Sequence, residues 1–360
     1  MTKVREENFW NDRFIKALKS LAPGTLLRDG LENVLRAKMG ALVLIGDSPP
    51  IMKVVDGGFN LHCEFTPAGF YELAKMDGAL QLSADARKIV CANAQLIPDP
   101  SIPTAETGTR HRTAERVAKQ TGALVIAISQ RRNIITVYIG NLRYTLKDSP
   151  SILNRANQAL QTLEKYRTVF QKGLTMLTAL EFEDMTTLAD VAGLIIKGEQ
   201  VARIARGIRR DIIELGEDGR LLTMQLEEKS PEEDEVLLLI HDYAANGDVM
   251  THREVREQLA ALPEEDLEPT AVCRLLGFHV TTAAIDMPVV PRGYRILRKL
   301  PRLPVNIIEN LVLYFKTLHR IYNAAIGELD SVEGIGEVRA KTIKDGLKRV
   351  RDQAVLERYL

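Results

Sequence analysis

The sequence predicts a multidomain protein in which an α/β domain is followed by all-α domains. Strand patterns alternate with helical patterns over residues 1–147, which indicates an α/β fold with a mixed central sheet. From residue 152 to about 215, apolar residues recur only at helical spacing. A basic tail that carries a glycine-containing hairpin closes the chain. We therefore expect domains at 1–148, 149–288 and 289–360.

The first domain is expected to begin with helices. Two helices are predicted within residues 8–39, separated by Ala22-Pro23-Gly24. The apolar run at 41–46 ends in turn residues at 47–50, so it predicts a buried strand followed by a turn. Thr66 and Pro67 predict the start of another helix. The remaining patterns indicate strands at 79–82, 88–92, 123–129, 134–139 and 142–146, a loop at 97–100 and a short helix at 112–120.

The middle of the chain is predicted to be a helical spine. Ser149-Pro150-Ser151 marks its start, and two apolar stripes follow within residues 152–215. The acidic run at 227–235 is interpreted as a solvated loop. Two further helical segments, at about 236–262 and 268–277, lead to a proline-rich stretch. A purely helical segment between two functional ends sets the distance between them.

Composition excludes several classes of protein. The chain has 360 residues, of which 45% are hydrophobic and 27% are charged, and its formal net charge is zero. The three cysteines lie far apart without ligand spacing, so neither a zinc site nor a disulfide framework is expected. The N-terminus lacks the apolar core of a signal peptide, and no apolar run approaches the roughly 20 residues of a membrane span. We expect a soluble, cytoplasmic protein without membrane contact.

The zero net charge hides a basic C-terminal tail. Between Arg292 and Arg351 there are thirteen basic and six acidic side chains, a surplus of seven positive charges. Such a surplus attracts the phosphate backbone of nucleic acids, with an affinity that falls steeply as salt rises.

Two short stretches predict a nucleotide triphosphate site. The first is Asp77-Gly78, in a tight turn, and the second is Thr107–Thr113, just before a helical pattern. Glycine allows a close approach of the backbone, and a helix start favours anions. Arg110 and Arg112 flank His111 and can bracket a polyphosphate, while an aspartate nearby can hold a divalent metal.

Each stretch has an ordinary explanation when taken alone. Asp77-Gly78 is then a simple turn, and Arg110-His111-Arg112 a solvated helix start. His111 alone is equally well a core or capping histidine. The occurrence of both stretches together, at this spacing, is what favours a nucleotide site.

The paired motifs Asp77-Gly78-Ala79 and Gly108-Thr109-Arg110-His111-Arg112-Thr113 closely resemble those of the diadenylate cyclase domain family. The order of a cyclase-like domain, a helical spine and C-terminal hairpins is similar to the members of that family that scan DNA for damage. The resemblance implies a nucleotidyltransferase that condenses two ATP into cyclic di-AMP and two pyrophosphates, with Mg²⁺ or Mn²⁺. It also implies a homo-octamer in which cyclase domains meet face to face.

The same resemblance assigns roles to single residues. Asp77 is the expected metal ligand and activator of the ribose 3′-hydroxyl, and Arg110, His111 and Arg112 are the other expected catalytic residues. The residues expected to bind ATP are Gly78, Leu96, Thr107, Gly108, Thr109, Arg110, His111, Arg112, Thr113 and Ser129. Either Arg131 or Arg132 could place a further basic side chain near the site.

Residues 329–340 have the form of a helix–hairpin–helix element, similar to domain 2 of RuvA. Gly334 and Gly336 would expose backbone N–H groups to a DNA phosphate, and Ile335 would anchor the hairpin. Basic side chains follow, so the predicted DNA-binding residues are Gly334, Ile335, Gly336, Arg339, Lys341 and Lys344. Residues 300–308 fit the same frame with Arg302 and Pro304 in place of the glycines, which puts a phosphate contact there in doubt.

Contacts of this kind read DNA shape, and the resemblance implies that branched DNA such as junctions lowers cyclase activity in a nucleoid-associated protein. Three alternatives stay open. The chain could be a nucleotide-sensing, DNA-binding scaffold without turnover, or the hairpin could serve only dimerisation or packing. A base-excision enzyme is a third alternative, but only twenty-four residues follow Gly336, which leaves little room for a base-flipping pocket.

Overall fold

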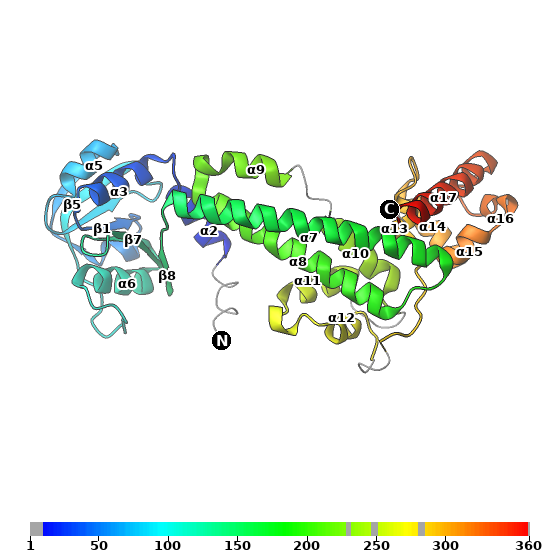
Figure 1. The fold of residues 1–360 in the computed structure, drawn as a ribbon. Helices are drawn as coiled ribbons and strands as arrows, with labels where there is room; N and C mark the ends of the chain where they lie inside the picture. The colour runs from blue at the N-terminus through cyan, green and yellow to red at the C-terminus, as the bar shows by residue number, and fades with distance from the viewer. Residues whose placement is uncertain (1–9, 228–231, 246–250, 280–284, 359–360) are drawn as a thin grey trace. The chain divides into compact units, whose positions relative to one another are not determined.

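The structure is a computed structural model and describes residues 10–227, 232–245, 251–279 and 285–358 (Figure 1). By internal packing the chain divides into two compact units. One unit runs to Asn157 and takes in Arg209–Met224, and the other comprises Gln158–Ile208 and the chain from Gln225 onward.

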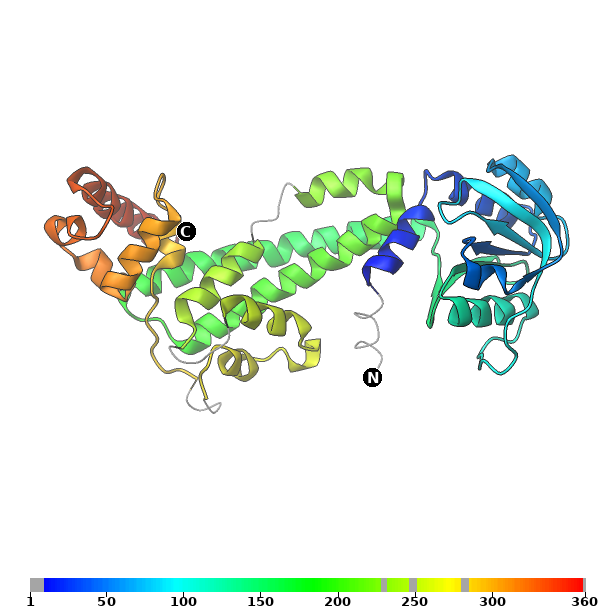
Figure 2. The same ribbon diagram turned by 180° about the vertical axis from the view of Figure 1, so that it is seen from behind.

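The first unit is built on a mixed β-sheet, seen from behind in Figure 2. The strands follow the order β2-β5-β4-β1-β6-β7-β8, and β3 pairs with β5. β1 and β4 are parallel, and the other pairs are antiparallel. The strands are β1 Ala41–Ile45, β2 Val55–Asp56, β3 Phe59–Glu64, β4 Ala79–Leu82, β5 Lys88–Leu96, β6 Leu124–Ser129, β7 Ile134–Ile139 and β8 Leu142–Thr145. The predicted α/β domain with a mixed sheet is confirmed.

Helices cover both faces of this sheet because successive side chains of a strand point to opposite faces. Val43 of β1 packs into the cluster formed with α2 (Asp12–Ser20), α3 (Leu26–Arg36) and α5 (Pro67–Leu73). Its neighbour Leu44 packs into the cluster formed with α6 (Thr109–Thr121). Figure 1 shows α3 and α5 on one side of the strands and α6 on the other.

Four local predictions need correction. The helix expected at 112–120 starts at Thr109, and β5 continues to Leu96. The expected turn at 47–50 contains the start of a short helix, α4 (Pro49–Met52), because prolines suit the first helical positions. β2 and β3 were not predicted. Every residue of β3 is exposed, although apolar and polar residues alternate along it.

The spine consists of helices, as predicted. α7 covers Ser149–Glu183 and α8 covers Leu188–Leu215, and a short 3₁₀ turn (Gly216–Gly219) and α9 (Arg220–Glu227) follow. Within the second unit, Gly173 of α7 lies against Leu194 of α8, so the absence of a side chain permits a close approach. The residues expected to mark a boundary at 149–151 form the first turn of α7.

Beyond the spine, the helix expected over 236–262 is two helices. They are α10 (Glu232–Tyr243) and α11 (His252–Ala261), and α12 (Pro269–Leu275) follows after a short 3₁₀ turn (Glu264–Asp266). Of the acidic run, residues 228–231 lie outside the described residues, and residues 232–235 begin α10 instead of a loop.

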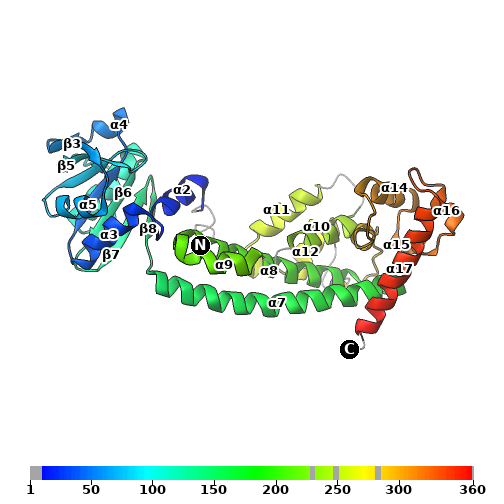
Figure 3. The ribbon, with the colours of Figure 1, turned by 90° about the horizontal axis from the view of Figure 1, so that it is seen from above.

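The C-terminal helices share one apolar cluster, and Figure 3 shows α14, α15, α16 and α17 gathered together. They are α13 Tyr294–Arg298, α14 Val305–Phe315, α15 Leu318–Asn323, α16 Ile326–Asp330 and α17 Glu337–Arg358. In the part of the chain that the structure describes, no helix has both the length and the apolar character required to cross a membrane.

Candidate nucleotide site and nucleic-acid hairpin

The topology of the sheet brings the predicted nucleotide residues to a single edge. β1 and β4 run parallel and both begin at this edge, whereas β5 and β6 run antiparallel to them and end there. Asp77 and Gly78 directly precede β4, Leu96 ends β5 and Ser129 ends β6. Residues more than fifty positions apart in the sequence therefore lie along one edge, here called the nucleotide edge.

The bend at Asp77-Gly78 requires glycine. Gly78 has a φ of +106°, and a Cβ at this position would lie 2.9 Å from the carbonyl oxygen of Ala94. It would also lie 3.0 Å from the carbonyl carbon of Asn93, which itself has a φ of +54° at an irregularity of β5. The close contact with β5 fixes the bend and leaves Asp77 exposed to solvent.

The start of α6 is built to receive an anion. Its N-cap is Gly108, which provides no side chain to cap the first N–H groups. Thr107, Gly108, Thr109 and Arg110 are all exposed. Uncapped N–H groups at a helix start, together with the helix dipole, favour a phosphate.

Side chains of α6 hold the loop that precedes it. Arg116 Nε donates to the carbonyl oxygen of Ile102 at 2.9 Å, and Lys119 Nζ donates to that of Pro103 at 2.8 Å. The hydroxyl of Thr104 donates to Glu115. These contacts fix the path of the chain into the helix start.

Arg110 reaches the nucleotide edge. A Cβ on Gly40 would lie 2.5 Å from Nη1 of Arg110 and 3.3 Å from the carbonyl oxygen of Ile128. The guanidinium therefore passes over the point where β1 begins beside the end of β6, next to Ser129. The hydroxyl of Ser129 accepts a hydrogen bond from the backbone N–H of Arg132 at 3.3 Å, which stabilises the β6–β7 turn.

The two arginines of the motif start from different sides of α6. Residues two positions apart are about 200° apart around a helix axis. Because α6 starts at Thr109, both arginines lie in its first turn, and whether they bracket one polyphosphate stays a prediction. Arg112 is exposed and Thr113 is half-buried.

His111 is buried, with 9% of its surface exposed. Its Nδ1 lies 2.9 Å from the hydroxyl oxygen of Tyr138. Burial, followed by the positive charges of Arg132, Arg143 and Arg110, lowers the pKa of His111, although Glu106 acts in the opposite direction. The charge of Arg132, in the β6–β7 turn, therefore acts on His111.

Leu96 lies at the nucleotide edge, but its side chain is buried in the apolar cluster under α6. A nucleotide contact there would involve its main chain. Sequence reasoning missed Gly40, Glu106, Tyr138 and Arg143, which surround the motif from separate elements. Only Gly40 carried a signal in the sequence, because a glycine directly before a buried strand indicates that another group approaches the backbone closely.

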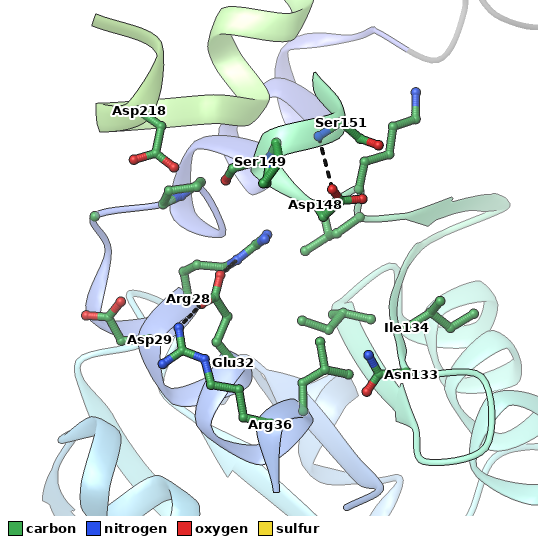
Figure 4. A pocket seen from close by; sticks show the side chains of 17 residues that line it. Arg28, Asp29, Glu32, Arg36, Asn133, Ile134, Asp148, Ser149, Ser151 and Asp218 are labelled. Carbon is green, nitrogen blue, oxygen red and sulfur yellow. Dashed lines mark hydrogen bonds and ion pairs between the residues drawn. The ribbon is translucent and has the colours of Figure 1, made fainter. Parts of the chain in front are cut away.

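A cavity of about 950 Å³ opens elsewhere in the first unit (Figure 4). Residues of α3, the start of β7 and the connection into α7 line it, and Figure 4 shows Arg28 and Glu32 on one side and Asp148 and Ser149 on the other. Arg28 is bound to Glu32 at 2.8 Å. None of the predicted nucleotide residues lines this cavity.

The C-terminal hairpin joins α16 to α17. Gly334 has a φ of +82°, and a Cβ there would lie 2.6 Å from Cδ1 of Ile307 in α14. Ile335 is buried in the shared cluster, and Ala340 is fully buried. Gly336 has open space where a Cβ would be. The turn between α13 and α14 also contains a residue in the left-handed backbone region, because Arg302 has a φ of +61°.

The predicted basic residues of the hairpin differ in their surroundings. Lys341 is exposed. Arg339 donates to the carbonyl oxygen of Gly334, and Lys344 Nζ donates to those of Tyr322 and Ala324, the latter at 2.7 Å. Arg339 and Lys344 therefore support main-chain carbonyls, while Lys341 faces solvent.

Comparison with known proteins identifies the family. Residues 28–142 match the family described as DisA bacterial checkpoint controller nucleotide-binding, and residues 146–285 match its linker region. The chain is 57% identical over 345 residues to DNA integrity scanning protein DisA of Carboxydothermus hydrogenoformans, covering 95% of this chain and 98% of the relative. The same protein from Symbiobacterium thermophilum is 54% identical over 96% and 98% of the two chains, and that from Clostridium botulinum strain Eklund 17B is 56% identical over 95% and 97%. The chain therefore belongs to the DisA family and is a diadenylate cyclase, an enzyme of the nucleotidyltransferase class.

Proposed function

We propose that the nucleotide edge binds one ATP and that two such edges join their nucleotides into cyclic di-AMP with release of two pyrophosphates. The observation that supports this most strongly is the meeting of the fixed Asp77-Gly78 bend and the uncapped start of α6 at one edge of the sheet. The bend offers a carboxylate. The start of α6 offers N–H groups and the guanidinium of Arg110, which can hold an anion and are here called the phosphate cradle. A nucleoside triphosphate with a divalent cation needs both.

The phosphates would lie at the start of α6. The N–H groups after Gly108 and the guanidinium of Arg110 would neutralise their charge, and the hydroxyls of Thr107, Thr109 and Thr113 would add hydrogen bonds. Arg112, on a different side of the helix, would act on a separate phosphate group or on the nucleotide of a facing protomer.

The chain supplies few ligands for a metal, which fits a cation held partly by substrate. In the described parts of the chain, no three side chains of the His, Cys, Asp and Glu types are grouped closely enough to bind a metal alone. Mg²⁺ is commonly held by one or two carboxylates together with phosphate oxygens. Asp77 provides one exposed carboxylate, and Nε2 of His111 is a buried nitrogen without a hydrogen-bond partner among the described residues. A bound Mg²⁺ or Mn²⁺ would offset the charge of the phosphates and lower the pKa of the ribose 3′-hydroxyl.

The reaction needs no covalent protein nucleophile. In each half-reaction the 3′-hydroxyl of one ATP attacks the α-phosphate of the other and gives up its proton, for which Asp77 is the proposed acceptor. A P–O bond to the 3′-oxygen forms, the bond between the α-phosphorus and its bridging oxygen breaks, and pyrophosphate leaves with that oxygen. Positioning and charge stabilisation then account for catalysis. Because each protomer contributes one edge, two protomers would have to face each other, and we propose that they do so within a homo-octamer.

Pyrophosphate release tests this chemistry. The purified chain with Mn²⁺ and ATP should release one pyrophosphate for each ATP consumed. 3′-Deoxy-ATP, which lacks the attacking hydroxyl, should bind with similar affinity and release none. Equal pyrophosphate release from both nucleotides would indicate hydrolysis and contradict the proposal.

We also propose that the C-terminal hairpin binds the backbone of branched DNA and that this binding lowers cyclase activity in the nucleoid-associated, cytoplasmic protein. The support comes from the tight turn at Gly334, the open position at Gly336 and the exposed Lys341. Backbone N–H groups at a helix start are common phosphate contacts in protein–DNA complexes.

Replacement of Gly336 by leucine should separate DNA binding from folding. A Cβ at Gly336 meets no atom within 4 Å, so Gly336→Leu leaves the packing intact but blocks the approach of a phosphate. Affinity for a four-way junction in a gel assay should fall about tenfold, since a charge-assisted hydrogen bond is worth roughly 1.5–3 kcal/mol. The control is Gly327→Leu in α16, where the space is equally open. Equal affinity of both variants would rule out the hairpin as the contact.

A further inference from the structure

A chain of hydrogen bonds connects His111 to two elements that the motif does not contain. Tyr138 lies on β7 with 1% of its surface exposed, and its hydroxyl donates to Oε1 of Glu106 at 2.9 Å. Arg143 of β8 donates to the same carboxylate oxygen. Glu106 itself lies in the loop that leads into α6, two residues before the N-cap Gly108.

The direction of these hydrogen bonds follows from the charge of Glu106. Burial acts to raise the pKa of Glu106, but the hydrogen bonds from Tyr138 and Arg143 outweigh it and keep that pKa below its ordinary value. Burial, then the hydrogen bond to Glu106, raises the pKa of Tyr138, so the phenol keeps its proton. An ionised carboxylate accepts only, and the Tyr138 hydrogen is therefore directed to Glu106.

The hydrogen bond between Tyr138 and Glu106 also determines which ring nitrogen of His111 carries the proton. With its hydrogen given to Glu106, the Tyr138 oxygen can only accept, so Nδ1 of His111 must carry the proton in their 2.9 Å contact. Nε2 is left with its lone pair, buried and without a hydrogen-bond partner among the described residues. The ring carbon next to Nε2, Cδ2, lies 3.7 Å from the place of a Cβ on Gly108, so this nitrogen is close to the helix start.

We propose that Glu106, Tyr138 and Arg143 are positioning residues of the cyclase site: they hold His111 in the Nδ1–H tautomer and present its Nε2 as an acceptor beside the phosphate cradle. The proposal rests on the function proposed above for the nucleotide edge. The three residues act on the reaction through His111. Glu106 lies in the loop that leads into α6. The same carboxylate therefore sets the tautomer of His111 through Tyr138 and holds this loop in place.

The variant Tyr138→Phe tests the proposal, because it removes one hydroxyl and keeps the ring. We expect kcat to fall about 10- to 100-fold, the range usual for groups that orient a reacting or metal-binding histidine. We expect KM for ATP to change less than about threefold, because the cradle remains.

The protein contains a matched control. The hydroxyl of Tyr144 on β8 donates to Oε2 of Glu214 at 2.6 Å, and both residues belong to the first unit. Tyr144→Phe removes a half-buried tyrosine–glutamate hydrogen bond without touching His111. It should lower Tm at least as much as Tyr138→Phe and leave kcat within about twofold. Equal loss of kcat in the two variants would reduce Tyr138 to a structural role and overturn the proposal.

Arg143 provides a second variant, on the surface, should Tyr138→Phe fold poorly. Its side chain is 47% exposed, so Arg143→Met should fold. We expect Arg143→Met to lower kcat and Arg143→Lys to restore most of it, because lysine keeps the charge beside Glu106. Equal activity of wild type and Arg143→Met would contradict the proposal.

A double-mutant cycle on kcat tests whether Tyr138 acts through His111. The kcat for ATP with Mn²⁺ is compared for wild type, His111→Gln, Tyr138→Phe and the double variant. If Tyr138 acts through His111, its replacement should have no further effect in the His111→Gln background. Additive losses would overturn the proposal. A wild-type protein that makes no cyclic di-AMP would instead refute the proposed function, and the positioning role with it.

Discussion

Asp77→Asn is expected to reduce formation of cyclic di-AMP at least about 100-fold, the scale on which loss of one preorganised charge-stabilising group acts in enzyme sites. The substitution keeps the size and shape of the side chain but removes its charge. Asparagine is a weak ligand for a divalent cation and cannot accept a proton from the 3′-hydroxyl. Because Asp77 is exposed on a bend that Gly78 fixes, the fold should be unaffected.

The measurement is turnover of ATP with Mn²⁺, followed by chromatography, together with Tm. Asp47→Asn is the matched control, since Asp47 is also an exposed aspartate in a connection next to a strand, beyond the opposite end of β1. It should retain wild-type turnover. Near-normal turnover by Asp77→Asn, with an unchanged Tm, would show that the carboxylate neither holds the metal nor activates the hydroxyl.

Glu181→Leu is expected to destabilise the second unit by about 3–5 kcal/mol, the usual cost of leaving one member of a buried ion pair without its partner. Glu181 of α7 and Arg295 of α13 form a salt bridge in which both side chains are 0% exposed. Glu181 also accepts a hydrogen bond from the hydroxyl of Tyr243 at 2.7 Å, and Arg295 Nη2 donates one to the hydroxyl of Thr178 at 3.1 Å. Leucine would leave the buried Arg295 guanidinium without the carboxylate that it binds.

Thermal and urea unfolding of the full chain measure this effect. The control is Glu183→Leu, which breaks the ion pair between Glu183 (36% exposed) and Arg358 (32% exposed). For this variant we expect the free energy of unfolding to fall by less than about 1 kcal/mol. The double variant Glu181→Leu/Arg295→Met should recover most of the stability, because neither member of the ion pair is left buried without the other. Equal stability of the two single variants would contradict a role of the buried pair in holding α13 on α7.

The sequence predicts the sheet where burial leaves a pattern. β1 and β6 are unbroken apolar runs, because helices cover both of their faces, and both were predicted within a residue or two. β3 alternates apolar and polar residues, the pattern of a half-buried strand, but it was overlooked, and all of its residues are exposed in the structure. The start of α6 was placed late because its first turn consists of polar residues, which give no apolar residue at helical spacing.

The candidate site shows a similar limit. The two motifs are short continuous stretches, so the family resemblance could find them. Glu106, Tyr138 and Arg143 are single residues of common types in three different elements, and only the antiparallel register of β7 with β8 and the loop before α6 brings them together. That Arg110 and Arg112 start from different sides of α6 also became clear only when the start of the helix was known.

The most direct test is to incubate the purified full chain with ATP and Mg²⁺ or Mn²⁺, with and without a four-way DNA junction. Products are separated by ion-exchange chromatography and identified by mass. We predict cyclic di-AMP in the absence of DNA and less of it when the junction is added. A protein that binds ATP and the junction but forms no dinucleotide under either condition would contradict the proposed function and leave a nucleotide-sensing DNA scaffold in its place.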